Sequence, residues 1–208
     1  MPLPELVLAS TSAYRRALLA RLGLPFTAVA PDVDESRHAG ESGPSLVVRL
    51  AEAKARAVAH AHPGTLIVGS DQAAVIGDRV LGKPGNRERA IEQLTLAAGK
   101  AVVFYTGLCL LNAATGRART LCEPFQVGFR RLSQAQIAGY VDRERPFDCA
   151  GGFKSEGLGI ALFERLEGSD PNALIGLPLI RLVELLASEG VDVLVAPQAS
   201  PTGVGEGA

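Results

Sequence analysis

The chain has 208 residues, of which 47% are hydrophobic and 21% are charged, and its formal net charge is −1. This composition is typical of a globular protein and excludes the disordered and collagen-like classes, and the length suits one domain with a sizeable core. A net charge near zero creates no global basic field that would attract nucleic acid or an anionic membrane, so any anion site must be local. Aromatic residues make up only 5% and Trp is absent, which also disfavours nucleic-acid binding.

The sequence also indicates the cellular compartment and the residues that form the domain. We expect neither a signal peptide nor a membrane span, because no apolar run has the required length and flanks. The three cysteines, Cys109, Cys122 and Cys149, are odd in number and show no C-x-x-C spacing. They predict neither a zinc site nor a disulfide framework and fit a reducing cytoplasm. We expect residues 1–196 to form one domain and residues 197–208, rich in Gly, Ala, Ser and Pro, to form a disordered tail.

The first third of the chain predicts alternating strands and helices. The apolar run Leu6–Ala9 predicts a short strand, and the hydroxyl residues 10–12 that follow it can cap a helix that ends at Gly23. Residues 26–30 predict a second strand, and residues 44–61 predict a long helix with a proline near its start. The expected inward face of this long helix consists of Leu46, Val47, Leu50, Ala57 and Val58.

The rest of the chain predicts both hairpins and helices. The run "TLIVGSD" (65–71) is continuously apolar and ends in polar residues, which predicts a buried, central strand. The elements expected after it are a hairpin over 73–82 turning at Gly77-Asp78, a helix over 86–98, strands over 101–112 and 123–132 joined around Thr115-Gly116, a helix over 133–143, a glycine-rich loop over 149–159, a strand over 160–168 and a helix over 178–190. This mixture indicates an α/β domain with a mixed sheet.

Two arginines in the first turns of the first helix are unexpected, because a helix N-terminus favours anions over cations. Arg15 lies three residues before Leu18, so it falls on or beside the face that packs inward, where a guanidinium needs an acceptor. The free N–H groups of the helix start, the capping hydroxyls and the forks of Arg15 and Arg16 together suit a phosphate. The alternative is a pair of surface arginines in salt bridges.

Three lysines extend this pattern. Lys54 lies four residues after Leu50 and four before Val58, so it points along the apolar stripe of the long helix. It is either a cation directed into a cleft or a lysine whose stem covers the edge of the stripe. Lys83, in "LGKPG", and Lys154, in the glycine-rich loop, are further cations whose alternative role is that of exposed loop lysines.

Carboxylates accompany these cations. Asp71 closes the buried strand, a common position for catalytic groups in open α/β sheets, although a turn cap is the alternative. Glu35 lies in the acidic turn "PDVDES", and Glu156 lies between glycines, where the backbone can approach a ligand closely. Hydrolysis of a phosphoanhydride needs cations that neutralise phosphates beside carboxylates that hold a metal or activate water.

Other catalytic patterns are missing from the sequence. The Walker A spacing, the dinucleotide-binding fingerprint and H-E-x-x-H do not occur. Only three histidines are present and none is beside a candidate nucleophile, which disfavours a Ser-His or Cys-His hydrolase. The residues alone therefore indicate an α/β protein with a local site for a polyphosphate or an anionic metabolite.

At the level of whole motifs, the sequence resembles the Maf family of nucleotide pyrophosphatases. The matching motifs span almost the whole chain: "LASTSAYRRALL", "DVDES", "RLAEAKA", "VGSDQ", "LGKPG", "YTGL", "AGGFKSEGLG" and "GSDPNALIGLPL". The pieces "SDQ", "FKSEG" and "LFERLEGSDPN" look most like the branch that acts on 7-methyl-GTP, because the dTTP/UTP branch would show threonine in place of Gln72 and glutamine in place of Glu156. One departure is Ala13, where many members have proline; the change removes no functional group.

The resemblance implies an elongated mixed sheet flanked by helices, with a deep cleft between two lobes. It implies hydrolysis of a nucleoside triphosphate, 7-methyl-GTP, to the monophosphate and pyrophosphate with a divalent cation, Mg²⁺ or Mn²⁺. The roles carried over by position are Asp71 as the general base, Tyr14, Gln72 and Glu156 as determinants of base specificity, Ser10, Arg15, Arg16, Lys54 and Lys83 as triphosphate ligands, and Glu35 with Asp71 as metal ligands.

The charge of the substrate supports the expected preference for 7-methylguanine as the nucleobase. Methylation at N7 makes guanine cationic, which suits an anionic Glu156 and a stacked Tyr14. Two alternatives stay open: a nucleotide-binding regulator of cell division, with which the family is associated, and a pyrophosphatase with another base preference. We expect a nucleotide as partner and neither nucleic acid nor membrane; periodicity leaves a homodimer open.

Overall fold

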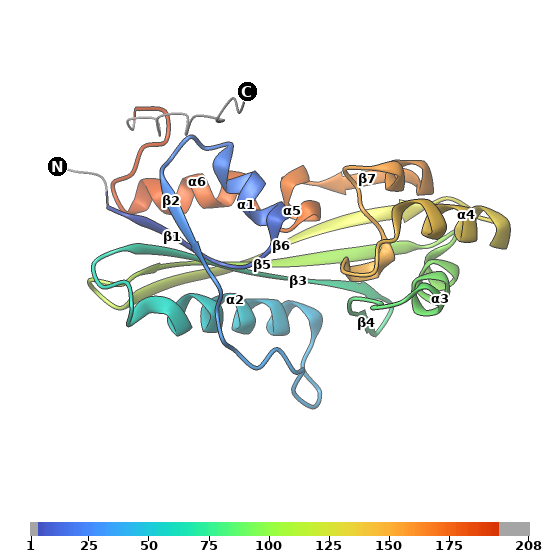
Figure 1. Cartoon of the computed structure of the whole chain (residues 1–208), viewed down its shortest axis with the longest axis horizontal. Coiled ribbons are helices and arrows are strands. Elements are labelled where there is room, and N and C mark those ends of the chain that lie inside the picture. The colour runs from blue at the N-terminus through green and yellow to red at the C-terminus, as the bar shows by residue number, and fades with distance from the viewer. Residues whose placement is uncertain (1–3, 196–208) are drawn as a thin grey trace, which may run out of the picture.

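The computed structural model describes residues 4–195 and consists of one mixed sheet with helices on both faces (Figure 1). The strands are β1 (Leu6–Ala9), β2 (Phe26–Val29), β3 (Leu66–Ile76), β4 (Arg79–Leu81), β5 (Ala101–Asn112), β6 (Arg117–Phe129) and β7 (Phe163–Gly168). The helices are α1 (Ala13–Ala20), α2 (Gly43–Ala59), α3 (Arg87–Ala97), α4 (Gln134–Glu144), α5 (Pro171–Ile175) and α6 (Leu179–Ser188). The expected α/β class is confirmed, whereas the expected tail, 197–208, lies outside the described residues.

The sheet combines a parallel and an antiparallel part in the order β2-β1-β3-β5-β6-β7. β1 pairs in parallel with β2 and β3, because α1 and α2 supply the crossovers that parallel neighbours require. β3, β5, β6 and β7 pair in antiparallel fashion, and the β5–β6 hairpin turns at Thr115-Gly116 as predicted. The long strands β3, β5 and β6 extend along the length of the molecule and give it an elongated shape (Figure 1).

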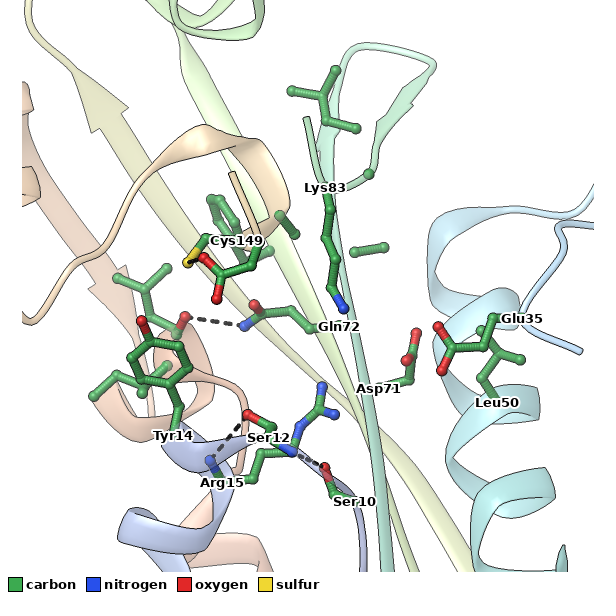
Figure 2. Close-up of a pocket in the computed structure, with 18 of the residues that line it drawn as sticks. Ser10, Ser12, Tyr14, Arg15, Glu35, Leu50, Asp71, Gln72, Lys83 and Cys149 are labelled. Atoms are coloured by element: carbon green, nitrogen blue, oxygen red, sulfur yellow. Dashed lines mark hydrogen bonds between the residues drawn. The ribbon is translucent and has the colours of Figure 1, made fainter. Parts of the chain in front are cut away.

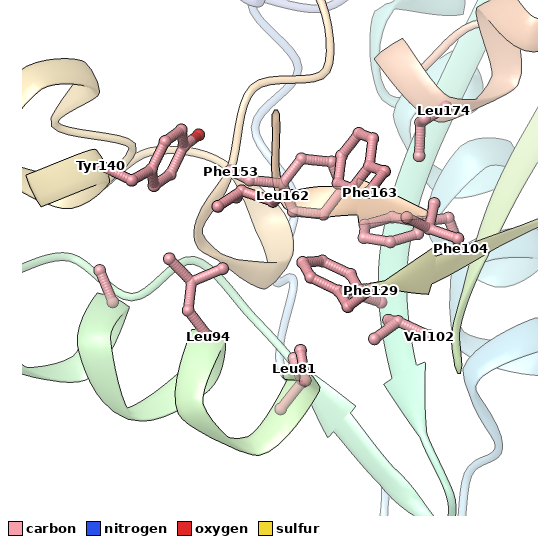
Figure 3. Close-up of a cluster of buried hydrophobic side chains, with 14 of the residues drawn as sticks. Leu81, Leu94, Val102, Phe104, Phe129, Tyr140, Phe153, Leu162, Phe163 and Leu174 are labelled. Atoms are coloured by element: carbon pink, nitrogen blue, oxygen red, sulfur yellow. The ribbon is translucent and has the colours of Figure 1, made fainter. Parts of the chain in front are cut away.

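Two groups of helices divide the molecule into two lobes along these long strands. In the first lobe, α1 and α6 cover one face of the sheet and α2 covers the other (Figure 1). In the second lobe, α3, α4 and β7 surround a cluster of aromatic rings (Figure 3). Phe153 lies at its centre, with its ring centroid 5.1 Å from that of Phe104 and 4.9 Å from that of Phe163, both in edge-to-face geometry.

Two glycines let α2 lie directly against the sheet. A Cβ at Gly69 of β3 would collide with the carbonyl oxygen of Ala51, and a Cβ at Gly107 of β5 would collide with that of Val47. Only glycine permits this backbone contact. The contact sets the depth of α2 and therefore brings the side chain of Lys54 to the level of β3.

Several predicted boundaries were wrong. Ala57 is exposed on α2 and not part of its inward face. β6 begins at Arg117, six positions before the predicted 123, and β7 begins at Phe163 after a short 3₁₀ helix at Leu158–Leu162. Helix α5 was not predicted. In the part of the chain that the structure describes, no helix combines the length and the apolarity needed to cross a membrane.

Candidate active site

The candidate site lies where β3 has an open edge. β1 pairs with β3 at Leu66–Gly69, and β4 pairs with it at Ala74–Ile76. Over residues 70–73 no described strand pairs with this edge. Successive side chains of a strand point to opposite faces, and at an open edge both faces are accessible from one cavity. Asp71, which faces α2, and Gln72, which faces α5, therefore line the same cleft (Figure 2).

The cleft has a volume of about 720 Å³, which suits a ligand of nucleotide size. It lies between the two lobes and receives side chains from α1, α2, β3 and the loops after β2, β4 and α4. All of the predicted site residues except Arg16 line it: Ser10, Tyr14, Arg15, Glu35, Lys54, Asp71, Gln72, Lys83 and Glu156. Arg16 is exposed on α1 and is not among the lining residues.

Lys54 joins two carboxylates from different elements. Its side chain leaves the inward face of α2 and is 5% exposed. Its Nζ atom lies 2.6 Å from Asp71 Oδ1 and 2.7 Å from Glu35 Oε1. Burial alone would raise the pKa of Glu35, but the hydrogen bond from Lys54 and the charges of Lys54, Lys83 and Arg15 lower it. The predicted cations and carboxylates are thus close enough to interact.

Arg15 enters the cleft from α1, which begins where the sequence predicted. The Oγ of Ser12 accepts a hydrogen bond from the Arg15 amide over 3.3 Å and caps the helix. The Nε of Arg15 donates to the carbonyl oxygen of Gly176 over 2.9 Å. Burial lowers the pKa of Arg15, while the charges of Asp71 and Glu35 oppose the change. With Nε held from behind, the two terminal nitrogens point into the cleft (Figure 2).

Ser10 and Lys83 complete the polar end of the cleft. Ser10 follows β1, and its Oγ accepts a hydrogen bond from the amide of Ser12 over 3.1 Å. Lys83 follows β4 on the opposite wall, and Figure 2 shows its amino group directed toward Asp71 and Gln72. Cations from α1, α2 and the β4 loop therefore surround Asp71.

The other end of the cleft contains an aromatic ring and acidic groups. Tyr14 lies beside Gln72 and Cys149 in Figure 2, and Glu156 lines the same end. Burial, together with smaller contributions from Cys149, Asp148 and Glu156, raises the pKa of the Tyr14 phenol to about 12. The phenol is therefore protonated at neutral pH.

Sequence reasoning missed some of the groups that shape this site. Cys149 and Asp148 line the acidic end, and backbone carbonyls of residues 173–176, at the end of α5 and just after it, contact Arg15 and Gln72. The motif "GSDPNALIGLPL" was the available signal for α5. Lys154, by contrast, is not a cleft cation: its Nζ donates to the carbonyl oxygen at position 144, at the end of α4, over 3.1 Å.

Comparison with known proteins gives consistent matches over most of the chain. The family model described as Maf-like protein matches residues 5–189. A protein from Alcanivorax borkumensis named 7-methyl-GTP pyrophosphatase is 62% identical over 190 residues, which cover 91% of this chain and 96% of the relative. Proteins of the same name from Nitrosococcus oceani and Pseudomonas aeruginosa are 59% and 55% identical over 191 residues each; the matches cover 92% of this chain and 96% and 100% of the relatives. The structure of a HAM1 protein from Coxiella burnetii matches with a TM-score of 0.50 at 16% identity, covering 89% of this chain and 99% of that chain, and indicates a shared fold.

Proposed function

Because this chain belongs to the Maf family, we propose that it hydrolyses a nucleoside triphosphate to the monophosphate and pyrophosphate, with 7-methyl-GTP as substrate. The observation that carries the proposal is the meeting of Arg15, Lys54 and Lys83 with Asp71 in one cleft. A triphosphate needs several cations from different directions, and an attacking water needs a fixed base. The names of the relatives support both the reaction and the nucleobase of the proposed substrate.

The polar end of the cleft binds the triphosphate in this proposal. The terminal nitrogens of Arg15 form a fork that matches two phosphate oxygens, and Lys83 and Lys54 approach from the other walls. The hydroxyl of Ser10 supplies a further polar group at the end of β1. These groups neutralise the charge that moves onto the pyrophosphate as it leaves.

Asp71 acts as the general base. Its carboxylate accepts the proton of a water molecule, whose oxygen forms a bond to the α-phosphorus. The bond between the α-phosphorus and its bridging oxygen breaks, and that oxygen leaves with the β- and γ-phosphates as pyrophosphate. The hydrogen bond from Lys54 over 2.6 Å and the packing of β3 against α2 fix the position of this carboxylate.

The carboxylates suit a divalent cation that is shared with the substrate. Glu35 and Asp71 converge on a single point, which the ammonium group of Lys54 occupies. Mg²⁺ is commonly held by one or two carboxylates and by substrate phosphates. Among residues 4–195, no group of three or more His, Cys, Asp or Glu side chains is arranged to hold a metal, so substrate phosphates and water would supply the remaining ligands. When bound, Mg²⁺ or Mn²⁺ would neutralise phosphate charge.

Tyr14, Gln72 and Glu156 select the base. N7 methylation places a positive charge on guanine, which favours the face of the Tyr14 ring and the carboxylate of Glu156. The raised pKa of Tyr14, which is due first to burial and then to the acidic groups nearby, marks an environment that disfavours a further negative charge. Of these causes, only the charges of Asp148 and Glu156 favour a cationic nucleobase over a neutral one, because burial disfavours a charge of either sign.

A substrate panel with product analysis tests the proposal. Purified protein with Mg²⁺ or Mn²⁺ is given 7-methyl-GTP, GTP and the other common triphosphates, and the released pyrophosphate and orthophosphate are measured separately. We expect pyrophosphate and 7-methyl-GMP, with the highest kcat/KM for 7-methyl-GTP. Release of orthophosphate from the γ-position would contradict the reaction, and a higher kcat/KM for an unmodified base would contradict the specificity. Binding without turnover would favour the regulatory alternative.

A further inference from the structure

Two backbone carbonyl oxygens next to the cleft each lie within hydrogen-bond distance of a cleft residue and of a buried hydroxyl group. The carbonyl oxygen of Gly176 lies 2.9 Å from Arg15 Nε and 2.9 Å from Ser70 Oγ. The carbonyl oxygen of Ala173 lies 2.8 Å from Gln72 Nε2 and 2.8 Å from Thr106 Oγ1. The segment from 173 to 176, which contains the end of α5, thus contacts one residue at each end of the cleft.

The two hydroxyl groups are inside the protein. Ser70 on β3 and Thr106 on β5 are both 0% exposed, and neither is among the described residues that line the cleft. Ser70 Oγ also lies 2.8 Å from the carbonyl oxygen of Gly107, so its single proton is shared between the carbonyl oxygens of Gly107 and Gly176. These serine and threonine side chains cannot touch a nucleotide directly, so any effect on it must pass through the residues that share their carbonyls.

At the polar end, the shared carbonyl determines how Arg15 presents its guanidinium. Because Nε is bonded to Gly176, only the terminal nitrogens are free for phosphate, and the fork has one orientation. Gly176 has a φ of +123°, a conformation that L side chains rarely adopt. The Ser70 hydroxyl holds this carbonyl against the sheet and so fixes the position of the oxygen to which Arg15 Nε donates.

The other end of the cleft, which contains Tyr14, Gln72 and Glu156 and would hold the nucleobase, is the base end. There, the shared carbonyl determines which amide atom of Gln72 faces the ligand. Gln72 Nε2 lies within hydrogen-bond distance of the carbonyl oxygens of Ala173 and Leu174 and 3.2 Å from Thr106 Oγ1. The two amide hydrogens are thereby committed to backbone acceptors, which leaves Oε1, an acceptor, for the cleft. Thr106 donates to the Ala173 carbonyl and so holds this acceptor in the position that the Gln72 amide requires.

We propose that Ser70 and Thr106 are positioning residues with separate roles: Ser70 orients Arg15 for the triphosphate through Gly176, and Thr106 orients Gln72 for the base through Ala173. This inference rests on the proposed function. Because the triphosphate is common to all substrates, loss of the Ser70 hydroxyl must weaken all of them alike. Loss of the Thr106 hydroxyl must change the discrimination between bases.

The test compares Ser70→Ala with Thr106→Val on 7-methyl-GTP and GTP. We expect Ser70→Ala to raise KM about fivefold for both nucleotides, as the loss of one buried hydrogen bond predicts, with an unchanged ratio of their kcat/KM values. We expect Thr106→Val to lower that ratio about fivefold by the same argument. The conservative variant Ser70→Cys keeps a weak donor and should raise KM less than Ser70→Ala does. Thr106→Ser keeps the hydroxyl and should have a kcat/KM ratio close to that of the wild type.

A double-mutant cycle tests whether Ser70 acts through Arg15. In an Arg15→Ala background, Ser70→Ala should change KM less than about twofold, because the residue that it orients is gone. An undiminished fivefold effect in that background would overturn the proposed route. A change in base preference caused by Ser70→Ala, or equal changes caused by both variants, would overturn the division of roles.

A matched control separates positioning from stability. Thr65 is also buried, and its Oγ1 donates to the carbonyl oxygen of His62 over 2.9 Å at the start of β3, among residues that do not line the cleft. Thr65→Val should lower the melting temperature without changing KM. If Ser70→Ala does not fold, Ser70→Cys takes its place in the cycle.

The same set of proteins separates failure of this inference from failure of the proposed function. Wild-type protein that neither hydrolyses 7-methyl-GTP nor binds its α,β-methylene analogue in calorimetry would contradict the function itself. Wild-type protein that is active, with Ser70 and Thr106 variants indistinguishable from Thr65→Val, would contradict this inference alone.

Discussion

The two ends of the cleft are built in different ways. At the polar end, Lys54 comes from a long helix, Asp71 from a central strand and Arg15 from a capped helix. At the base end, Cys149 and Glu156 come from the loop between α4 and β7. The polar end is thus held mainly by the packing of α1 and α2 on the sheet, whereas the base end combines Tyr14 of α1 and Gln72 of β3 with side chains from this loop.

This difference matches what each end has to do in the proposed reaction. Attack on phosphorus requires a base and cations in fixed positions, and regular elements hold side chains more accurately than loops do. Recognition of a base tolerates variation, and loops accept changes of sequence without loss of the scaffold. Substitutions at the polar end should therefore stop the reaction, and those at the base end should redirect it.

The largest effect is expected for Asp71→Asn. The amide cannot take the proton of the attacking water, so we expect kcat to fall about 10³-fold, while binding of a nonhydrolysable analogue persists. Pyrophosphate release and calorimetry measure the two quantities. Asp142→Asn, at an exposed carboxylate paired with Arg87, is the control and should be fully active. Near-normal turnover of Asp71→Asn would refute the assignment of the base.

A large effect on both activity and stability is expected for Gly107→Ala. The added Cβ would overlap the backbone at Val47, so α2 must move away from β5 and displace Lys54. We expect a loss of about 2 kcal/mol in the free energy of unfolding, as for an overpacked core, together with a lower kcat. Gly139→Ala is the control, because no atom lies within 4 Å of a Cβ at that position. If Gly107→Ala matched this control in a melting experiment and an activity assay, the close contact would be unimportant.

A moderate effect, confined to specificity, is expected for Glu156→Gln at the base end. Removal of one negative charge should reduce the preference for 7-methyl-GTP over GTP about tenfold, as a charge-assisted contact predicts, with kcat for GTP little changed. Ratios of kcat/KM give the measurement. Glu164→Gln, at an exposed position on β7, is the control. An unaltered preference would show that the charge at 156 does not read the base.

The effect with the least bearing on catalysis concerns the chemistry of Cys149. Burial, with a smaller contribution from Asp148, raises the pKa of its thiol to about 12. Below that pH the thiol is protonated, and the reactive thiolate increases as the pH rises toward 12. We expect alkylation by iodoacetamide at pH 8 to be at least about tenfold slower than for an unfolded cysteine, as measured by mass spectrometry. Rapid labelling at pH 8 would show that the base end is more open than the structure indicates.

Local patterns in the sequence were sufficient for most of the elements. The helix starts next to Ser12, Asn86 and Ser133 and the hairpin turn at Gly77-Asp78 are confirmed at the predicted positions, and the side chains of Ser12, Asn86 and Ser133 cap their helices. Helix α5 was missed because its five residues, Pro171–Ile175, are too few for a periodic pattern. Nothing in the sequence predicts that Lys154 turns toward α4 or that Arg16 lies outside the cleft.

What the sequence by itself determined is the α/β class, the strand and helix order, and the set of residue types from which a site for an anionic nucleotide could be made. These follow from hydrophobic periodicity, turn residues and caps, which act between near neighbours in the chain. Only the tertiary structure decided that β3 has an open edge at residues 70–73, that Lys54 joins Glu35 to Asp71, and that α5 holds Arg15 and Gln72. These arrangements depend on which distant strands pair and how closely α2 packs on them, and pairing and packing between distant segments leave no local pattern in the sequence.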